Sequence, residues 1–563
     1  MKMSRAVIAL WMFGSMSGWA GSKADSVAKT DKPATKPPLP KDLCTPPPAG
    51  VAPSLPARIL EGQGSAYIHF AITTSNPKAQ EFFTQGVAQM HSFWANEAER
   101  SFLQAAALDP EAPMPWWGVA MVAAGDYRPR FQLDTADLMF GKNKDPRVVK
   151  NRATDAMEKA IALSGKGTDV EQMYIAALKA RRLPAAGADA DEGYINGLNA
   201  LIAKYPQEVD AKLFLALHTM RGFGLPDHDP RPGTMDADNL LRQLLIDAPD
   251  HPGVHHYVIH GFEGATFAKD AWPSCKRYAE LVTNIPHALH MPGHIYSQTG
   301  RWEDAVQSFS NAAENEQKWM QADKLYGRGH HGHNVHYQST ALAFSGQYDK
   351  AIAAAQTLLD FGENPRETSQ IDGFYSIYRQ GWFAMLRALV QAQRWDDVLA
   401  GKMLPEYKKP REQAWLHWAR GLAYAAQGKT AEAKVEAKKM DESFREFVSK
   451  VKRQPTEELQ VARLELDGHI AVSARRYKRA LNVLQTASDR ERRLVYSEPP
   501  YYPRPVALAL GDVAAKTGDR ARAAKAYRVA LEQFPDAVAA RKVRVWSKAW
   551  AIPLGKRSGR GTD

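Results

Sequence analysis

Cysteine is almost missing from this chain, whose 563 residues include only Cys44 and Cys275. Two thiols cannot build the thiolate-rich sites that many structural zinc proteins use. Any metal site in this protein must therefore use imidazole and carboxylate ligands. Cys44 lies in a Pro- and Lys-rich stretch, and the sequence leaves open whether it pairs with Cys275.

Long apolar runs and the common catalytic motifs are also missing. Beyond the N-terminus, no segment has the run of roughly eighteen apolar residues that a membrane-spanning helix needs. The sequence contains no G-x-S-x-G, Walker A, G-x-G-x-x-G or H-E-x-x-H motif. The usual signatures of hydrolases, nucleotide-binding proteins and zincin proteases are therefore absent. The sequence also lacks the alternating β-branched residues that would indicate a sheet.

The first twenty residues have the three parts of a signal peptide. Lys2 and Arg5 form the basic region, Ala6 to Ser17 the short apolar region, and Gly18 to Ala20 a small-x-small cleavage site. Residues 21–60 are rich in Pro, Lys, Ala and Ser and predict a disordered linker. We expect a periplasmic or secreted protein, with an uncleaved N-terminal anchor as the alternative.

The net charge of +11 is concentrated towards the two ends, in the linker and in a basic tail at residues 541–563. No basic patch interleaved with aromatic residues accompanies this charge. We therefore expect no nucleic-acid partner, and we interpret the charge as supporting solubility or adhesion to an anionic surface.

From about Asn76 onward the pattern is helical, with Ala-rich periodic segments separated by short Gly, Pro or Asp breaks. Three segments have the Ala-x3-aromatic signature of a tetratricopeptide repeat (TPR), and their aromatic residues are Phe102, Phe309 and Tyr527. The sequence predicts an all-α, TPR-like helix–turn–helix solenoid. We divide it into N-terminal repeats at 61–250, a His-rich part at 251–360 and C-terminal repeats at 361–540.

Eleven of the seventeen histidines lie between His251 and His336, and their spacing follows the repeat. His256 and His290 are 34 residues apart, as are His260 and His294, and 34 is the TPR period. Three neighbouring first helices therefore carry imidazoles on one stripe outside the hydrophobic core stripe, which in TPR proteins lines the concave groove.

The residues on this stripe are candidates for binding a transition metal. The candidate ligands are His256, His260, His287, His290, His294, His333 and His336, and Glu263 is the candidate catalytic residue. Two histidines at i and i+4 can hold one ion, and a carboxylate one turn further on can be a ligand, orient a ligand or act as a base. Zinc, copper, iron and nickel all accept imidazole, and export favours copper or zinc.

Pro292 complicates this register because proline is excluded from a helix interior. Either the helix kinks there, or it begins near Met291 with Pro292 in its first turn. In the second case His287 and His290 lie on the entering loop, and the i, i+4 argument fails for His290 and His294.

The other histidines have structural interpretations. His251 belongs to a turn, His255 to the core side of its helix, and His330 and His331 to a loop. The remaining isolated histidines are surface or satisfied core residues: His69, His218, His228, His417 and His469.

At these motifs the sequence resembles a group of exported bacterial TPR proteins. The resemblance rests on an opening segment from His69 to Met121, then His-Tyr-x-Ile-His…Glu at 256–263, His-Met-Pro-x-His-Ile at 290–295 and His-Asn-x-His at 333–336. It covers most of residues 65–400. It implies a His/Glu site on a TPR scaffold and no particular reaction, because the group has no settled activity.

Two hypotheses follow. In the first, the groove holds a transition-metal ion used in catalysis or metal handling, and in the catalytic case Glu263 moves protons. In the second, the solenoid is a scaffold that binds a peptide, a small molecule or a partner protein without metal, and the histidines donate hydrogen bonds.

Overall fold

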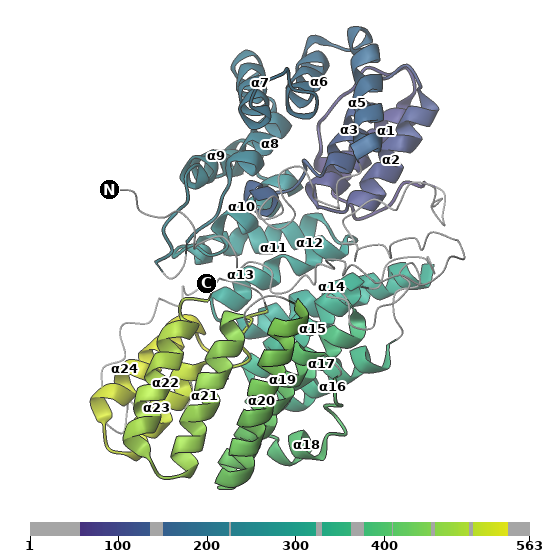
Figure 1. Ribbon diagram of the computed structural model, residues 1–563. Helices are drawn as coiled ribbons and strands as arrows, with labels where there is room; N and C mark the ends of the chain where they lie inside the picture. Colours follow the sequence, from purple (N-terminus) through teal and green to yellow (C-terminus); the bar gives the residue numbers. More distant parts are fainter. Residues whose placement is uncertain are drawn as a thin grey trace, which may run out of the picture.

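The computed structural model describes residues 57–134, 150–224, 227–322, 329–361, 376–407, 409–451, 456–494 and 499–538. Within these ranges the chain is helical, and consecutive helices pack as hairpins (Figure 1). The predicted all-α solenoid is confirmed. The predicted signal peptide, most of the predicted linker, Cys44 and the basic tail lie outside the described residues.

The N-terminal hairpins precede the His-rich part. They pair α1 (Pro77–His91) with α2 (Ala95–Leu108), α3 (Met114–Ala124) with α5 (Lys150–Leu163), α6 (Asp169–Arg182) with α7 (Ala190–Lys204), and α8 (Val209–Thr219) with α9 (Thr234–Asp247).

The His-rich hairpins follow in the middle of the chain. They pair α10 (Pro252–Phe262) with α11 (Trp272–Leu281), the short α12 (Pro286–His290) and α13 (Pro292–Gln298) with α14 (Trp302–Ala322), and α15 (Gly329–Ser345) with α16 (Tyr348–Asp360).

The C-terminal hairpins complete the solenoid. They pair α17 (Ile377–Gln391) with α18 (Trp395–Ala400), α19 (Pro410–Ala426) with α20 (Thr430–Val451), α21 (Glu457–Ser473) with α22 (Tyr477–Glu491), and α23 (Val506–Lys516) with α24 (Arg520–Gln533). None of the helices in the described ranges is long and apolar enough to cross a membrane.

The Ala-x3-aromatic signature marks close packing within hairpins. The Phe102 ring lies against Gly86 of the first helix and Gly118 of the next hairpin, and a Cβ added at either glycine would be 2.6 Å from a ring carbon. Phe309 covers Gly293 and Tyr527 covers Gly511 in the same way. A glycine in the first helix therefore lets an aromatic ring of the second helix approach the backbone.

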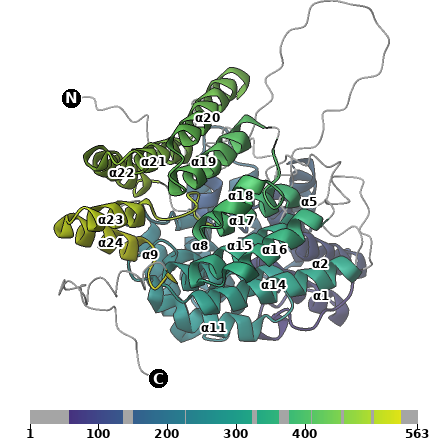
Figure 2. The ribbon, with the colours of Figure 1, turned by 90° about the horizontal axis from the view of Figure 1, so that it is seen from below.

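The N-terminal segment folds back onto the His-rich hairpins. The backbone amides of Thr283 and Asn284 both donate to the carbonyl of Gly62 at 3.0 Å. The rings of Trp94 and Trp319 meet edge to face with centroids 4.6 Å apart. Helix α1 also packs against α10, so the turn between α1 and α2 lies next to α10. Figure 2 shows the molecule from below, with α14, α15 and α16 next to one another.

Two large cores meet in the His-rich part. One runs from Ile68 to Trp319 and the other from Leu342 to Tyr527. A small cluster that includes Phe309 and Phe344 lies between them. The predicted site therefore lies where the two halves of the solenoid join. The boundaries of the three predicted segments stay predictions.

Replacing Gly86 with alanine should destabilise the protein. The new methyl group would overlap the Phe102 ring, which is held from the other side by Gly118. Overpacking of this kind costs about 1–3 kcal/mol of unfolding free energy, which urea denaturation would measure. Gly165→Ala is the control, because a Cβ there meets nothing within 4 Å. Equal effects of the two substitutions would contradict this account of the packing.

Candidate functional site

Helix α10 is a buried helix that nevertheless carries three histidines. All eleven of its residues are buried, from Pro252 to Phe262. His251 caps the N-terminus by accepting a hydrogen bond from the Gly253 amide, and Pro252 occupies the first turn. His251 thus belongs to a turn, as predicted. His255 is satisfied by Ser274 Oγ and the Pro249 carbonyl, and contributes to structure.

The first imidazole group consists of His256, His260 and His287. One ring nitrogen from each of the three lies within 4.8 Å of the others, so together they could hold a metal ion. His256 Nδ1 donates to the backbone carbonyl of His91 at 2.5 Å. The neutral ring therefore carries its lone pair on Nε2, as a metal ligand requires.

The second imidazole group begins with His290 and His294, whose Nε2 atoms are 2.9 Å apart. Pro292 begins α13, and Met291 continues the helical backbone from α12 with φ −57° and ψ −39°. The structure thus combines the two alternatives: a helix begins at Pro292, and the helical backbone of Met291 joins it to α12. His287 and His290 nevertheless lie on a short helix instead of a loop, and His290 and His294 still meet.

Glu263 lies between the two groups. It caps the C-terminus of α10, and Oε1 is 3.2 Å from His294 Nδ1 while Oε2 is 3.7 Å from His260 Nδ1. A proton on His294 Nδ1 facing this carboxylate leaves Nε2 as the lone pair that faces His290. This is the carboxylate–histidine arrangement that orients metal ligands in proteins.

Helix α15 adds His333 and also His330, which was predicted to lie in a loop. The prediction for His330 and His331 was wrong, because α15 begins at Gly329. The His333 ring is 4.9 Å from His290 and 5.6 Å from His330, and the His330 ring is 6.1 Å from both His287 and His290. His330 Nδ1 lies 2.6 Å from the buried Glu316 carboxylate. His330 therefore joins the cluster.

His336 faces a different neighbour. Its Nδ1 donates to Gln380 Oε1 at 2.6 Å. Burial, together with the positive charges of Arg387 and Arg379, lowers its pKa to about 3. The structure thus places His336 beside α17, whereas the imidazole cluster consists of His256, His260, His287, His290, His294, His330 and His333.

Most of the cluster is covered instead of lining an open groove. His256, His260 and His290 are 0%, 6% and 1% exposed, and His287, His294, His330 and His333 are partly exposed. The groove was predicted from the usual role of this helix stripe. In this chain the stripe is covered because the N-terminal segment folds back over it.

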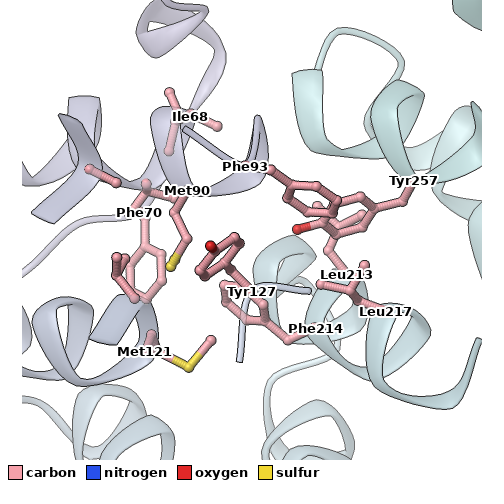
Figure 3. Close-up of a cluster of buried hydrophobic side chains, with 14 of the residues drawn as sticks. Ile68, Phe70, Met90, Phe93, Met121, Tyr127, Leu213, Phe214, Leu217 and Tyr257 are labelled. Atoms are coloured by element: carbon pink, nitrogen blue, oxygen red, sulfur yellow. The ribbon is translucent and has the colours of Figure 1, made fainter. Parts of the chain in front are cut away.

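Phe93 covers the first group directly. Its ring is stacked 5.2 Å from His260 and 5.5 Å from His287, and lies 4.4 Å from His256. Figure 3 shows Phe93 approaching Tyr257 of α10 from the turn after α1. Phe93 has φ +53°, as do Gln393 and Arg475 at the equivalent turns to within a few degrees, whereas Gly300 and Gly518 are glycines. A residue with a side chain is strained in this conformation. At Phe93 the ring makes contacts with three imidazoles.

Burial keeps these imidazoles neutral. Desolvation lowers the pKa of His256 to about 3 and lowers the pKa of His260, His287, His290 and His333 well below the usual value of 6.5. Neighbouring imidazoles add to the effect in each of these last four. A neutral imidazole is the form that binds metal.

A second group of metal-ligating side chains, His91, Asp210 and His251, lies next to the first. His91 Nε2 donates to Asp210 Oδ1 at 2.8 Å, and His91 Nδ1 pairs with Tyr257 Oη at 2.8 Å. His251 accepts from the Gly253 amide at Nδ1, so its proton is on Nε2, which faces Asp210 at 3.5 Å. Both ring nitrogens of His91 thus have hydrogen-bond partners, which makes this group a hydrogen-bond network around His91.

This network supports the site through His91. The ring of His91 is fixed by Asp210 and Tyr257, and its backbone carbonyl orients His256. Sequence reasoning missed His91 because it lies 165 residues before His256 in another repeat. In the sequence, His91 is recognisable only as a histidine at the end of a helix, a position that many surface histidines share.

The comparisons with known proteins agree with the repeat architecture. Residues 506–537, which form α23 and α24, match the tetratricopeptide repeat family. No curated protein matches the chain. The fold and this match define a TPR-type solenoid.

Solved structures with which the chain aligns share little sequence with it. The Cut9–Hcn1 hetero-tetramer of the APC/C is 12% identical with a TM-score of 0.26, covering 83% of this chain and 75% of that one. Yeast Tom70 is 11% identical with a TM-score of 0.33, covering 85% and 89%. The human IFIT1 dimer with m7Gppp-AAAA is 12% identical with a TM-score of 0.30, covering 85% and 92%.

The buried imidazoles should make stability fall at mildly acidic pH. Below pH about 6.5 His256 becomes protonated in the unfolded chain. In the folded protein the buried ring stays neutral down to its pKa of about 3. The stability due to neutral burial is thus complete above pH 6.5 and is lost as the pH falls. Between pH 6.5 and 5.5 this group alone should cost roughly 1 kcal/mol.

Urea denaturation at the two pH values, with a chelator present, would measure this loss. His256→Gln removes one titrating group, so the variant should lose roughly 1 kcal/mol less than the unmodified protein over the same interval. His69→Gln, which changes an exposed histidine, is the control. An identical loss in all three proteins would contradict neutral burial of His256.

Proposed function

We propose that this protein binds transition-metal ions in the imidazole cluster formed by α10, α12, α13 and α15, with Glu263 orienting the ligands. The solenoid is the scaffold, and the bound metal serves either a metal-dependent reaction or metal handling. The predicted export of the chain stays part of this proposal, which places the protein in the periplasm or outside the cell.

One observation carries the proposal. His256 Nε2, both nitrogens of His260 and His287 Nε2 are buried and have no hydrogen-bond partner among the described residues. Leaving a buried polar atom unsatisfied costs about 1–3 kcal/mol. One ring nitrogen from each of these three histidines lies within 4.8 Å of the others. A cation shared by the three rings would give these nitrogens a partner, which hydrophobic packing does not provide.

The protonation pattern also supports metal binding. In two ligand rings the nitrogen opposite the metal-facing one points at a fixed acceptor. His256 Nδ1 donates to the His91 carbonyl, and His294 Nδ1 faces Glu263 Oε1 at 3.2 Å. In the absence of metal, the 2.9 Å contact between His290 and His294 needs a proton between the two Nε2 atoms. A metal ion replaces that proton, as it does whenever imidazole changes from donor to ligand.

The ligand chemistry narrows the choice of ion. The cluster is built of imidazole, with the carboxylates of Glu263 and Glu316 in supporting positions. Imidazole sets suit zinc and copper, and oxygen-rich sets suit magnesium and calcium. We propose copper or zinc.

The alternative function, binding of a protein partner or peptide, rests on the solenoid. Stacked helical hairpins present extended surfaces that commonly bind partners. The buried histidines do not serve that function, because they face one another and are covered by Phe93. Partner binding would therefore use other surfaces and is compatible with a metal site.

Metal analysis of protein purified without an affinity tag would test the proposal. We expect bound copper or zinc at one equivalent or more after growth or reconstitution with the ion. His260→Gln should lower the bound metal, because it removes a ring whose two nitrogens make no hydrogen bond. The exposed His69→Gln should leave the metal content unchanged.

Circular dichroism of each variant would separate loss of ligand from loss of fold. The proposal fails if the unmodified protein holds less than about a tenth of an equivalent and takes up none when the ion is added. It also fails if folded His260→Gln binds metal as the unmodified protein does.

A further inference from the structure

The number of imidazoles in the cluster exceeds what one ion uses. Zinc sites in proteins take about four ligands, and catalytic sites take about three protein ligands plus an open position. The cluster brings seven histidine rings together, each with a centroid within 6.3 Å of another. A single ion would leave several buried rings with no function.

The rings divide into two groups by which atoms converge. His256, His260 and His287 bring one nitrogen each within 4.8 Å. His290 and His294 meet through their Nε2 atoms, and His333 is stacked against His290 at 4.9 Å. His287 and His290 lie one turn apart on α12 with nearly parallel rings, 15° apart in plane and 6.3 Å apart in centroid.

Glu263 connects the groups without belonging to either. Its two oxygens face His260 Nδ1 of the first group and His294 Nδ1 of the second. A single carboxylate thus orients one ligand in each group. The same carboxylate supplies negative charge between two positions where cations would lie.

Resting on the metal site proposed above, we infer that the cluster is a two-ion centre. The first ion is held by His256, His260 and His287. The second is held by His290 and His294, whose Nε2 atoms converge, with the rings of His333 and His330 beside them. Each ion then has fewer than four ligands from these rings and keeps open coordination positions.

The charges of such a centre define its further ligand. Two divalent ions carry four positive charges, while the imidazoles are neutral and the carboxylates facing the cluster are Glu263 and Glu316. The balance requires small anions at the open positions. We therefore assign hydroxide, or an exogenous small anion of similar size, as the further ligand of these ions.

Titration of the metal-free protein with Cu²⁺ would test this inference. We expect two equivalents to bind. The electron paramagnetic resonance signal should grow with the first equivalent and then lose intensity or broaden with the second, because two adjacent Cu²⁺ ions couple. Azide, added as the small anion, should change the spectrum of the two-copper form.

Matched variants would assign the ions to their groups. His256→Gln and His290→Gln should each lower the stoichiometry from two to one and restore an uncoupled signal. His69→Gln should retain two coupled ions. Because the coupling is measured on the unmodified protein, the test does not depend on whether a variant folds.

The outcomes distinguish this inference from the proposed function. No bound copper overturns both. One equivalent in the unmodified protein overturns the two-ion centre and leaves the metal site intact. Two equivalents with fully uncoupled signals overturn the placement of the ions side by side.

Discussion

At the turn between α1 and α2, the carbonyl of His91 accepts a hydrogen bond from His256 Nδ1 across 165 residues of chain. The carbonyl can do this because it ends a helix, where backbone acceptors have no partner within the helix. The hydrogen bond selects the tautomer of His256 and directs Nε2 at the cluster. It exists only because the N-terminal hairpin returns to α10. The chemistry of the site thus depends on how the solenoid closes.

Closure also explains why so polar a group can be buried. An isolated charge in this interior would be unfavourable, and desolvation accordingly lowers the pKa of the buried imidazoles. The rings stay neutral, so the solenoid buries dipoles instead of charges. The negative charge of Asp210 is retained in the neighbouring network. Burial raises its pKa, but hydrogen bonds from His251 and His91 outweigh that effect and lower it. The protein thus keeps a buried charge beside the cluster and pairs it with His91 by a hydrogen bond.

The fold and much of the cluster could be predicted from local patterns. The signature aromatics predicted the hairpins, because Phe102, Phe309 and Tyr527 pack on glycines of the preceding helices. The repeat period predicted that His256, His260, His290 and His294 share one stripe, and these four residues lie in the cluster. His287 also joins them, although Pro292 made its position uncertain. A periodic sequence reports which face of a helix a residue occupies, and that was sufficient for these five.

Three other features depend on long-range contacts that no local pattern contains. His336 lies on the same helix as His333, but its Nδ1 donates a hydrogen bond to Gln380 of α17 instead of joining the cluster. His330 was predicted to lie in a loop, yet it lies in α15 and its Nδ1 pairs with Glu316 of α14. The open groove became an interior because Phe93 lies over the imidazoles. Each difference comes from a residue in another repeat.

The strained Phe93 shows how a repeat protein acquires a site of its own. At this turn position the chain adopts positive φ, which Gly300 and Gly518 do at no steric cost and which Gln393 and Arg475 share with Phe93. What distinguishes Phe93 is its ring, which fills the space above His256, His260 and His287. The unsatisfied imidazole nitrogens lie close to this ring, and their cost is recovered only if a ligand binds them. The aromatic cover and the unsatisfied nitrogens meet at one point of the solenoid, which is where its specific function should be sought.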